Sequence, residues 1–128
     1  MLFSLFGKGD GDESFSALKV NFTNYEAGKG VLYIRLGDEN DELITTAQIN
    51  LSNDESFFEF AQLKPGKYTL RCFQDLNGNE LLDRNFIGIP QEPYGFANNP
   101  KVRFGPPSIK EQTIEIKDDK SLVIRLKR

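Results

Sequence analysis

The stretch "DLNGNELLDRN", which begins at Asp75, has the residue types and the spacing of a calcium-binding loop. Asp75, Asn77, Asn79 and Asp83 fall at positions one, three, five and nine, and the backbone carbonyl of Leu81 falls at position seven. Calcium takes roughly six to eight oxygen ligands, which carboxylates and amides at alternating positions of a loop can supply. The pattern predicts a metal site formed by Asp75, Asn77, Asn79, Leu81 and Asp83.

The ligand set of this loop is incomplete. Position six, where a calcium loop has glycine, is Glu80, and position twelve, where an EF-hand has a bidentate glutamate, is Phe86. Asparagine and aspartate also cap turns by bonding to their own backbone, without any ion. Two interpretations therefore stay open. One is a calcium loop of modest affinity, completed by Glu92, Asn98 or Asn99, and the other is a self-capped turn.

The segment 85–108 differs from the rest of the chain, because it holds five of the six prolines together with three glycines and four aromatic residues. Proline cannot donate to a strand ladder, so the composition predicts a long Gly/Pro/aromatic loop. Its aromatic side chains either cover one end of the fold or line a ligand groove. The predicted ligand or surface residues are Phe86, Glu92, Tyr94, Phe96, Asn98, Asn99, Arg103 and Phe104.

Catalytic chemistry has little support in the residue types. The chain has no histidine and one cysteine, which excludes the histidine-dependent nucleophile systems and an internal disulfide. Asp75, Glu80, Asp83 and Glu92 could in principle form the acid pair of a glycan hydrolase, but nothing in the sequence fixes their separation. Cys72 is expected to be a buried structural thiol. We therefore predict a protein that is not an enzyme, with calcium as its one candidate cofactor.

The elements that must position these residues are strands. From Ser14 onward apolar residues alternate with polar ones, and seven strand candidates are separated by turn signals. In "GVLYIRLG", for example, Leu32, Ile34 and Leu36 face inward, while Val31, Tyr33 and Arg35 look the other way.

The fold class expected from this pattern is all-β. We predict a single antiparallel two-sheet β-sandwich, transthyretin-like or immunoglobulin-like, of about seven strands. A flexible N-terminal leader at 1–14 is expected to precede the β-sandwich domain at 15–128.

Composition limits the partners. The 128 residues are 38% hydrophobic and 27% charged, with a net charge of −3, which is typical of a globular protein and disfavours nucleic acid as a partner. No apolar run is long enough to span a membrane as a helix. We expect a protein or glycan partner, and a monomer or weak homo-oligomer.

The stretch "LKPGKYTLRCFQDLNGNELLDRNFIGIPQEPYGFANNPKVRFGPPS", residues 63–108, resembles the signature of the bacterial domain of unknown function 2141 family. Members of that family typically read Pro-Gly-x-Tyr, Asp-x-Asn-Gly-Asn-Gly-x-x-Asp, Gly-Ile-Pro, Tyr-Gly-Phe-Ser-Asn-Asn and Arg-Phe-Gly-Pro-Pro in this order. Here Glu80 replaces the second loop glycine, and Ala97 replaces the serine. The resemblance implies a transthyretin-like sandwich in an exported bacterial protein, periplasmic or extracellular, although this chain shows no signal peptide. It implies no established activity.

Together these features predict a non-catalytic binding or interaction module. Its site would combine the 75–83 loop, braced by calcium, with the aromatic residues of 86–104. The alternative is a structural or assembly subunit of the cell envelope or of an extracellular structure, because exposed sheet edges can add strands from a partner. A glycan hydrolase is the third hypothesis and has the least support.

Overall fold

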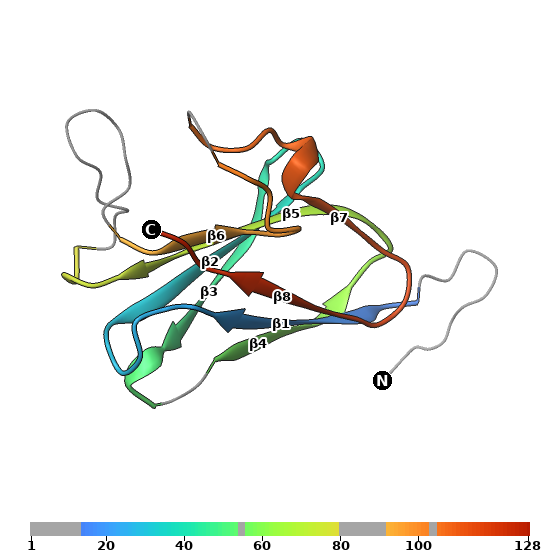
Figure 1. The fold of residues 1–128 in the computed structure, drawn as a ribbon. Helices are drawn as coiled ribbons and strands as arrows, with labels where there is room; N and C mark the ends of the chain where they lie inside the picture. Colours follow the sequence, from blue (N-terminus) through green and yellow to red (C-terminus); the bar gives the residue numbers. More distant parts are fainter. Residues whose placement is uncertain (1–13, 54–55, 80–91, 103–104) are drawn as a thin grey trace.

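The computed structural model describes residues 14–53, 56–79, 92–102 and 105–128. These residues form eight strands in two sheets that lie as two layers, as Figure 1 shows, together with the short 3-10 turns η2 (Leu51–Asn53) and η3 (Lys110–Gln112). The strands are β1 (Ser16–Thr23), β2 (Val31–Asp38), β3 (Leu43–Asn50), β4 (Phe57–Leu63), β5 (Gly66–Asp75), β6 (Tyr94–Phe96), β7 (Thr113–Ile116) and β8 (Lys120–Arg125). The prediction of an all-β fold with two sheets is confirmed.

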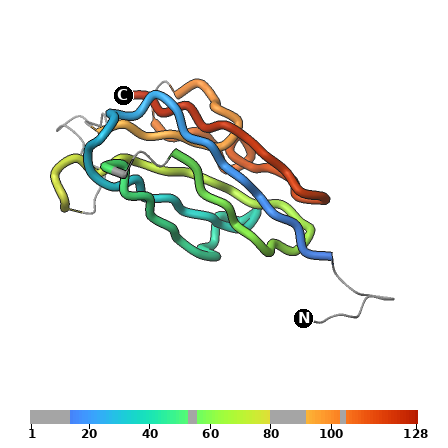
Figure 2. The backbone as a smooth tube through the Cα atoms, turned by 90° about the horizontal axis from the view of Figure 1, so that it is seen from below, coloured from blue at the N-terminus to red at the C-terminus, as the bar shows by residue number. Residues whose placement is uncertain are grey.

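The smaller sheet has the order β4-β1-β8, and the larger sheet has the order β3-β2-β5-β6. β7 also pairs with β5, so β6 and β7 share one edge of β5, with β7 along Gly66–Thr69 and β6 along Arg71–Phe73. Every strand pair is antiparallel except β1–β8, which is parallel and departs from the antiparallel expectation. In Figure 2 the first and last strands, blue and red, run side by side. All the other strands come between β1 and β8 in the sequence. No tight hairpin turn therefore forces this pair to be antiparallel.

The core lies between the sheets and follows the predicted alternation. β1 contributes Leu18, Val20 and Phe22, and β2 contributes Leu32, Ile34 and Leu36, all of them buried. Each such side chain stabilises the fold by roughly 2 kcal/mol through removal of apolar surface from water. The alternation continues along β5, β7 and β8, where the buried residues are Tyr68, Leu70, Cys72, Ile114, Ile116 and Ile124, with Leu126 just after β8. Leu122 on β8 is only partly buried.

The predicted loop at 85–108 needs a correction. Tyr94–Phe96 forms the strand β6, which is hydrogen-bonded to the middle of β5 and is the eighth strand. Pro93 and Pro100 stand on either side of this strand and not within it, so the proline argument does not apply to the strand itself. The parts 85–91 and 103–104 of the predicted loop lie outside the described residues. The corner before β5 is fixed by the Tyr68 hydroxyl, which donates to the Lys64 carbonyl at 2.5 Å. Residues 1–13 of the predicted leader at 1–14 lie outside the described residues.

Candidate functional site

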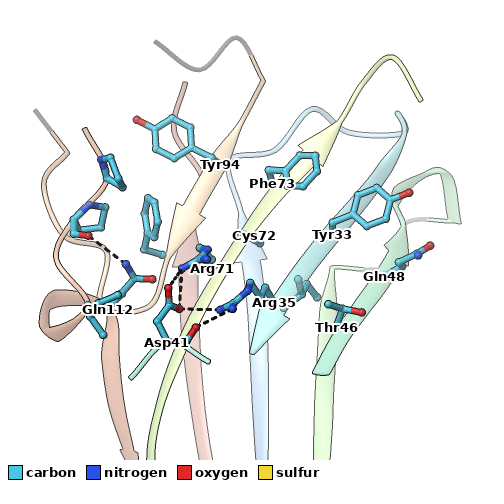
Figure 3. A pocket seen from close by; sticks show the side chains of 15 residues that line it. Tyr33, Arg35, Asp41, Thr46, Gln48, Arg71, Cys72, Phe73, Tyr94 and Gln112 are labelled. Carbon is cyan, nitrogen blue, oxygen red and sulfur yellow. Dashed lines mark hydrogen bonds and ion pairs between the residues drawn. The ribbon is translucent and has the colours of Figure 1, made fainter. Parts of the chain in front are cut away.

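An aromatic row crosses the outer face of the larger sheet. Tyr33 on β2 is the register partner of Phe73 on β5, and Phe73 is the partner of Tyr94 on β6. The Tyr33 and Phe73 rings are stacked, with their centroids 5.4 Å apart and their planes at 22°. These residues occupy the strand positions that point away from the core, because neighbouring positions such as Ile34 and Cys72 point into it. Figure 3 shows the three rings above the sheet.

A cationic row lies two residues further along the same strands. Arg35 on β2 is directly opposite Arg71 on β5, and the next partner, on β6, is Phe96. Like charges in directly opposed positions destabilise a sheet, so this pair needs a counter-charge. Asp41 supplies it from the β2–β3 turn and lies between the two guanidinium groups in Figure 3.

Asp41 is held by four side-chain hydrogen bonds. Its Oδ1 accepts from Arg35 Nη1 at 2.8 Å, from Arg71 Nη1 at 3.0 Å and from the Thr69 hydroxyl at 3.2 Å, and its Oδ2 accepts from Arg71 Nη1 at 3.1 Å. Partial burial works to raise its pKa, but the hydrogen bond and charge of Arg71, the charge of Arg35 and the Thr69 bond together hold the pKa of Asp41 below its usual value. The carboxylate is therefore ionised at neutral pH.

The segment before β7 forms a wall beside these rows. Ser108 and Glu111 cap the η3 turn reciprocally, because the Ser108 backbone N–H donates to Glu111 Oε1 at 2.9 Å and the Glu111 N–H donates to Ser108 Oγ at 3.2 Å. Asn98, just after β6, donates its amide to the carbonyls of Glu111 and Thr113 at 3.1 and 2.9 Å. These bonds fix the wall against the edge of the sheet.

Gln112 completes the wall with an unsatisfied polar atom. Its side chain is 2% exposed, and its Nε2 donates to the carbonyls of Pro107 and Ser108 at 3.3 and 3.4 Å. Its Oε1 is buried and has no hydrogen-bond partner among the described residues. A buried acceptor without a donor costs free energy, about 1–3 kcal/mol.

The two rows and the wall enclose a groove of about 740 Å³. Its described lining contains two arginines and one carboxylate, so the groove carries an excess positive charge within a chain of net charge −3. Besides the residues of the two rows and Asp41, the lining consists of Ile34, Thr46, Gln48, Cys72, Pro106, Pro107, Ile109 and Gln112. The volume falls in the range of small-molecule and oligomer sites.

The predicted ligand residues are only partly brought together here. Tyr94 and Phe96 line the groove. Asn98 supports the wall, and Asn99 bonds to β8, donating to the Val123 carbonyl at 2.9 Å and accepting from the Arg125 N–H at 2.8 Å. Glu92 is 4% exposed and lies at the 75–79 turn instead. Phe86, Arg103 and Phe104 lie outside the described residues.

The turn that follows β5 is bonded to its own backbone. Asp75 Oδ1 accepts from the Gly78 N–H at 3.0 Å, and Asn77 Oδ1 accepts from the Asn79 N–H at 3.1 Å. Glu92 Oε2 accepts from the Leu76 N–H at 2.7 Å, which ties the start of β6 to this turn. The turn thus has the internal bonds of the self-capped interpretation. The proposed ligands Leu81 and Asp83, with Glu80, lie outside the described residues.

Sequence reasoning missed most of the groove: Tyr33, Arg35, Asp41, Thr46, Gln48, Arg71, Phe73 and Gln112. One signal was available, because Tyr33 and Arg35 in "LYIRL" and Arg71 and Phe73 in "LRCFQ" are large side chains at outward strand positions. An aromatic residue repeated at outward positions of two strands forms an apolar patch, which indicates a covered or functional face.

Cys72 does not contribute reactive chemistry to the groove that it lines. The thiol is free and buried, and desolvation raises its pKa far above the ordinary value, although a hydrogen bond with the Gly95 backbone works to lower it. The thiolate is the nucleophile, so this cysteine is unreactive near neutral pH. The expectation of a buried structural thiol is confirmed.

Clustered metal ligands and membrane-spanning helices are both absent from the described residues. Nowhere in ranges 14–53, 56–79, 92–102 and 105–128 do three or more His, Cys, Asp or Glu side chains group so as to hold a metal ion. The same residues contain no helix of the length and apolarity needed to cross a membrane.

Comparisons with known proteins agree with the resemblance found at 63–108. The sequence profile of domain of unknown function 2141, described as an uncharacterized protein conserved in bacteria, matches residues 20–124. Comparison with curated proteins gives no match, and neither does comparison with solved structures. The profile spans β1 to β8 and thus both sheets and the groove. The chain belongs to the bacterial domain of unknown function 2141 family.

Proposed function

We propose that this protein is a non-catalytic binding module and that its ligand site is the groove on the outer face of the larger sheet. The observation that carries the proposal is the aromatic row beside the arginine pair. The three rings are half-buried on an outer sheet face, and a row of aromatic rings beside a pair of directly opposed arginines is typical of a surface that a ligand covers.

The dimensions of the two rows define the ligand that fits. The aromatic row crosses three strands, which is about 10 Å, and the cationic row lies about 7 Å away along the strands. A ligand that uses both rows therefore needs a flat apolar surface and an anionic group separated by about 7 Å. A partner or ligand of this kind matches the excess positive charge of the groove.

The bonding of Asp41 supports binding without turnover. Both of its oxygens accept hydrogen bonds from Arg71, and Oδ1 also accepts from Arg35 and Thr69. Its pKa is held below the usual value, which is the opposite of what a general acid requires. Glycoside hydrolysis uses two carboxyl groups, and Asp41 is the one carboxylate in the described lining of the groove.

Titration with 8-anilinonaphthalene-1-sulfonate, a dye with an apolar ring system and one anionic group, tests this proposal. We expect saturable one-to-one binding, weakened about tenfold by Tyr33→Ala and by Arg71→Gln. The matched controls are Phe57→Ala and Arg125→Gln, which remove the same side-chain types from the exposed face of the smaller sheet. Circular dichroism would verify that each variant is folded. Equal affinity of groove and control variants would overturn the proposal.

A second candidate is an assembly subunit, and the edge strand β3 favours it. β3 ends the larger sheet, and Leu43 and Ile44 on it are 59% and 47% exposed. An eight-residue edge strand with exposed apolar side chains can add a strand from a second chain. Sedimentation velocity would test this: a mass that rises with concentration and falls for Ile44→Lys supports assembly, whereas a strict monomer argues against it.

Calcium bracing of the 75–79 turn is a separate part of the proposal. Asp75 and Glu92 are both buried, at 3% and 4% exposure, and both bond to the backbone of this turn. Carboxylate and amide oxygens on one short turn are ligands that calcium accepts. Export to the periplasm or outside the cell is proposed from the family resemblance, and fractionation of bacteria that carry the native gene would test it.

A further inference from the structure

We infer that the ligand of the groove is an acidic glycan, an oligosaccharide with a carboxylate on its sugar rings, and that Arg71 binds this carboxylate. The inference rests on the proposed function, because it names the ligand class of the same groove. It depends on three observations. Arg71 has donors that make no hydrogen bond among the described residues, the groove lies on a sheet face, and its lining contains neutral polar groups.

Arg71 keeps most of its donors available. Its Nη1 bonds to Asp41, whereas Nε and Nη2 have no hydrogen-bond partner among the described residues. Its side chain is 35% exposed, so the free side of the guanidinium group reaches the groove. A guanidinium group matches a carboxylate with two parallel hydrogen bonds. Asp41 neutralises one of the two arginines, which leaves one positive charge for the ligand.

The floor of the groove disfavours a peptide. It is the face of a paired sheet, in which the backbone groups of β2 and β5 bond to neighbouring strands within the sheet. A peptide gains its affinity for a sheet by pairing with backbone at an edge, whereas the floor of this groove is the face of the paired strands β2 and β5. A peptide laid over the aromatic row would leave its own N–H and C=O groups without partners.

The neutral polar atoms of the groove fit hydroxyl groups. The lining contains the hydroxyls of Tyr94 and Thr46 and the amide of Gln48. A sugar hydroxyl both donates and accepts, so it can bond to each of these groups. The apolar faces of the sugar rings would lie against the aromatic row, which has room for roughly two rings.

Isothermal titration with paired trisaccharides tests the inference. The acidic probes are the trimers of galacturonate, glucuronate and mannuronate, and each is compared with its carboxyl-reduced form, which keeps the linkage and loses the charge. We expect at least one acidic trimer to bind about tenfold more tightly than its reduced form. Arg71→Gln should remove this difference, because the acidic trimer should lose its added affinity and bind no more tightly than the reduced sugar. Arg125→Gln, an equal loss of charge on the smaller sheet, should change neither affinity.

The outcomes separate this inference from the proposed function. If the anionic dye binds in the groove and no uronate trimer binds, the glycan inference is wrong and the binding groove stands. Tighter binding of an acidic tripeptide such as Glu-Tyr-Glu than of every trimer would also overturn it. If neither dye nor trimer responds to Tyr33→Ala, both proposals are wrong. Equal affinity for acidic and reduced trimers would refute the role of Arg71.

Discussion

The groove and the 75–79 turn both contain polar side chains, and they use them differently. In the turn, the Asp75 and Asn77 oxygens accept from backbone N–H groups two or three residues away. In the groove, Gln112 keeps a buried acceptor without a donor and Arg71 keeps free donors within the described part of the chain. The turn thus uses these polar atoms to hold a chain reversal, whereas the unbonded donors of Arg71 are the ones that the proposed ligand would bind.

The largest expected effect on stability is that of Gly30, which packs against the backbone where the turn begins. Gly30 has φ +66°, and a Cβ there would lie 2.1 Å from the Asp75 carbonyl oxygen. Gly30→Ala should lower the free energy of unfolding by about 3 kcal/mol or more, because backbone strain and a clash with main chain add together. Gly78→Ala is the matched control, since Gly78 has φ +79° with open space around it and should cost about 1 kcal/mol.

Urea unfolding followed by circular dichroism would measure both glycine variants. Gly30→Ala should lose more free energy of unfolding than Gly78→Ala. That result would show that the close contact of Gly30 with the Asp75 backbone matters, in addition to the backbone strain that both variants share. Equal losses of free energy would contradict the role of the Gly30–Asp75 contact, because the turn would then need only a residue that tolerates positive φ at each site.

The next largest expected effect on stability is that of Asp41, which supplies the counter-charge for the two arginines of the groove. Asp41→Asn leaves Arg35 and Arg71 facing each other without a counter-charge, and we expect a loss of about 2 kcal/mol in the free energy of unfolding. Adding Arg71→Gln to this variant should recover part of the loss, because one of the two opposed charges is gone. Asp118→Asn, at an exposed position between β7 and β8, is the control and should change stability little.

The same aspartate gives a pH dependence with a definite sign. The pKa of Asp41 is lower in the folded state, so its stabilisation is complete above the unfolded pKa of about 4 and is lost as the pH falls through the folded value. The stability difference between wild type and Asp41→Asn should therefore be constant from pH 7 to about 5 and shrink below about pH 4. A difference that grows in acid would contradict the assigned interactions of Asp41.

The comparison also explains what the sequence could and could not predict. The turn was found because Asp75, Asn77 and Asn79 are neighbours in one short stretch, and local hydrogen bonding depends on sequence spacing. The inward faces of the strands were found because burial repeats every second residue. Neither rule needs knowledge of which strands are paired.

The groove depends on pairing, and pairing is not local. Tyr33 and Phe73 meet because β2 and β5 are neighbours in one register, although β3 and β4 come between them in sequence. A shift of one residue would turn both rings to the opposite face, so the aromatic row exists only in this register. The short strand β6 was missed for a related reason, because Tyr94–Phe96 becomes a strand through β5 and through the Lys127 backbone, to which Tyr94 also bonds.

The smallest expected effect is that of calcium on the turn. If the ion binds with a dissociation constant near 1 mM, calcium at about 10 mM should stabilise the fold by about 1.4 kcal/mol and raise the melting temperature by about 5 °C. Asp75→Ala should abolish this shift, and magnesium should not reproduce it, because magnesium requires a tighter octahedral shell. An unchanged melting curve in calcium would leave the self-capped turn as the full account of Asp75 and Asn77. The described lining of the groove includes none of residues 75–79, so the groove should bind the anionic dye equally well whether or not calcium binds to the turn.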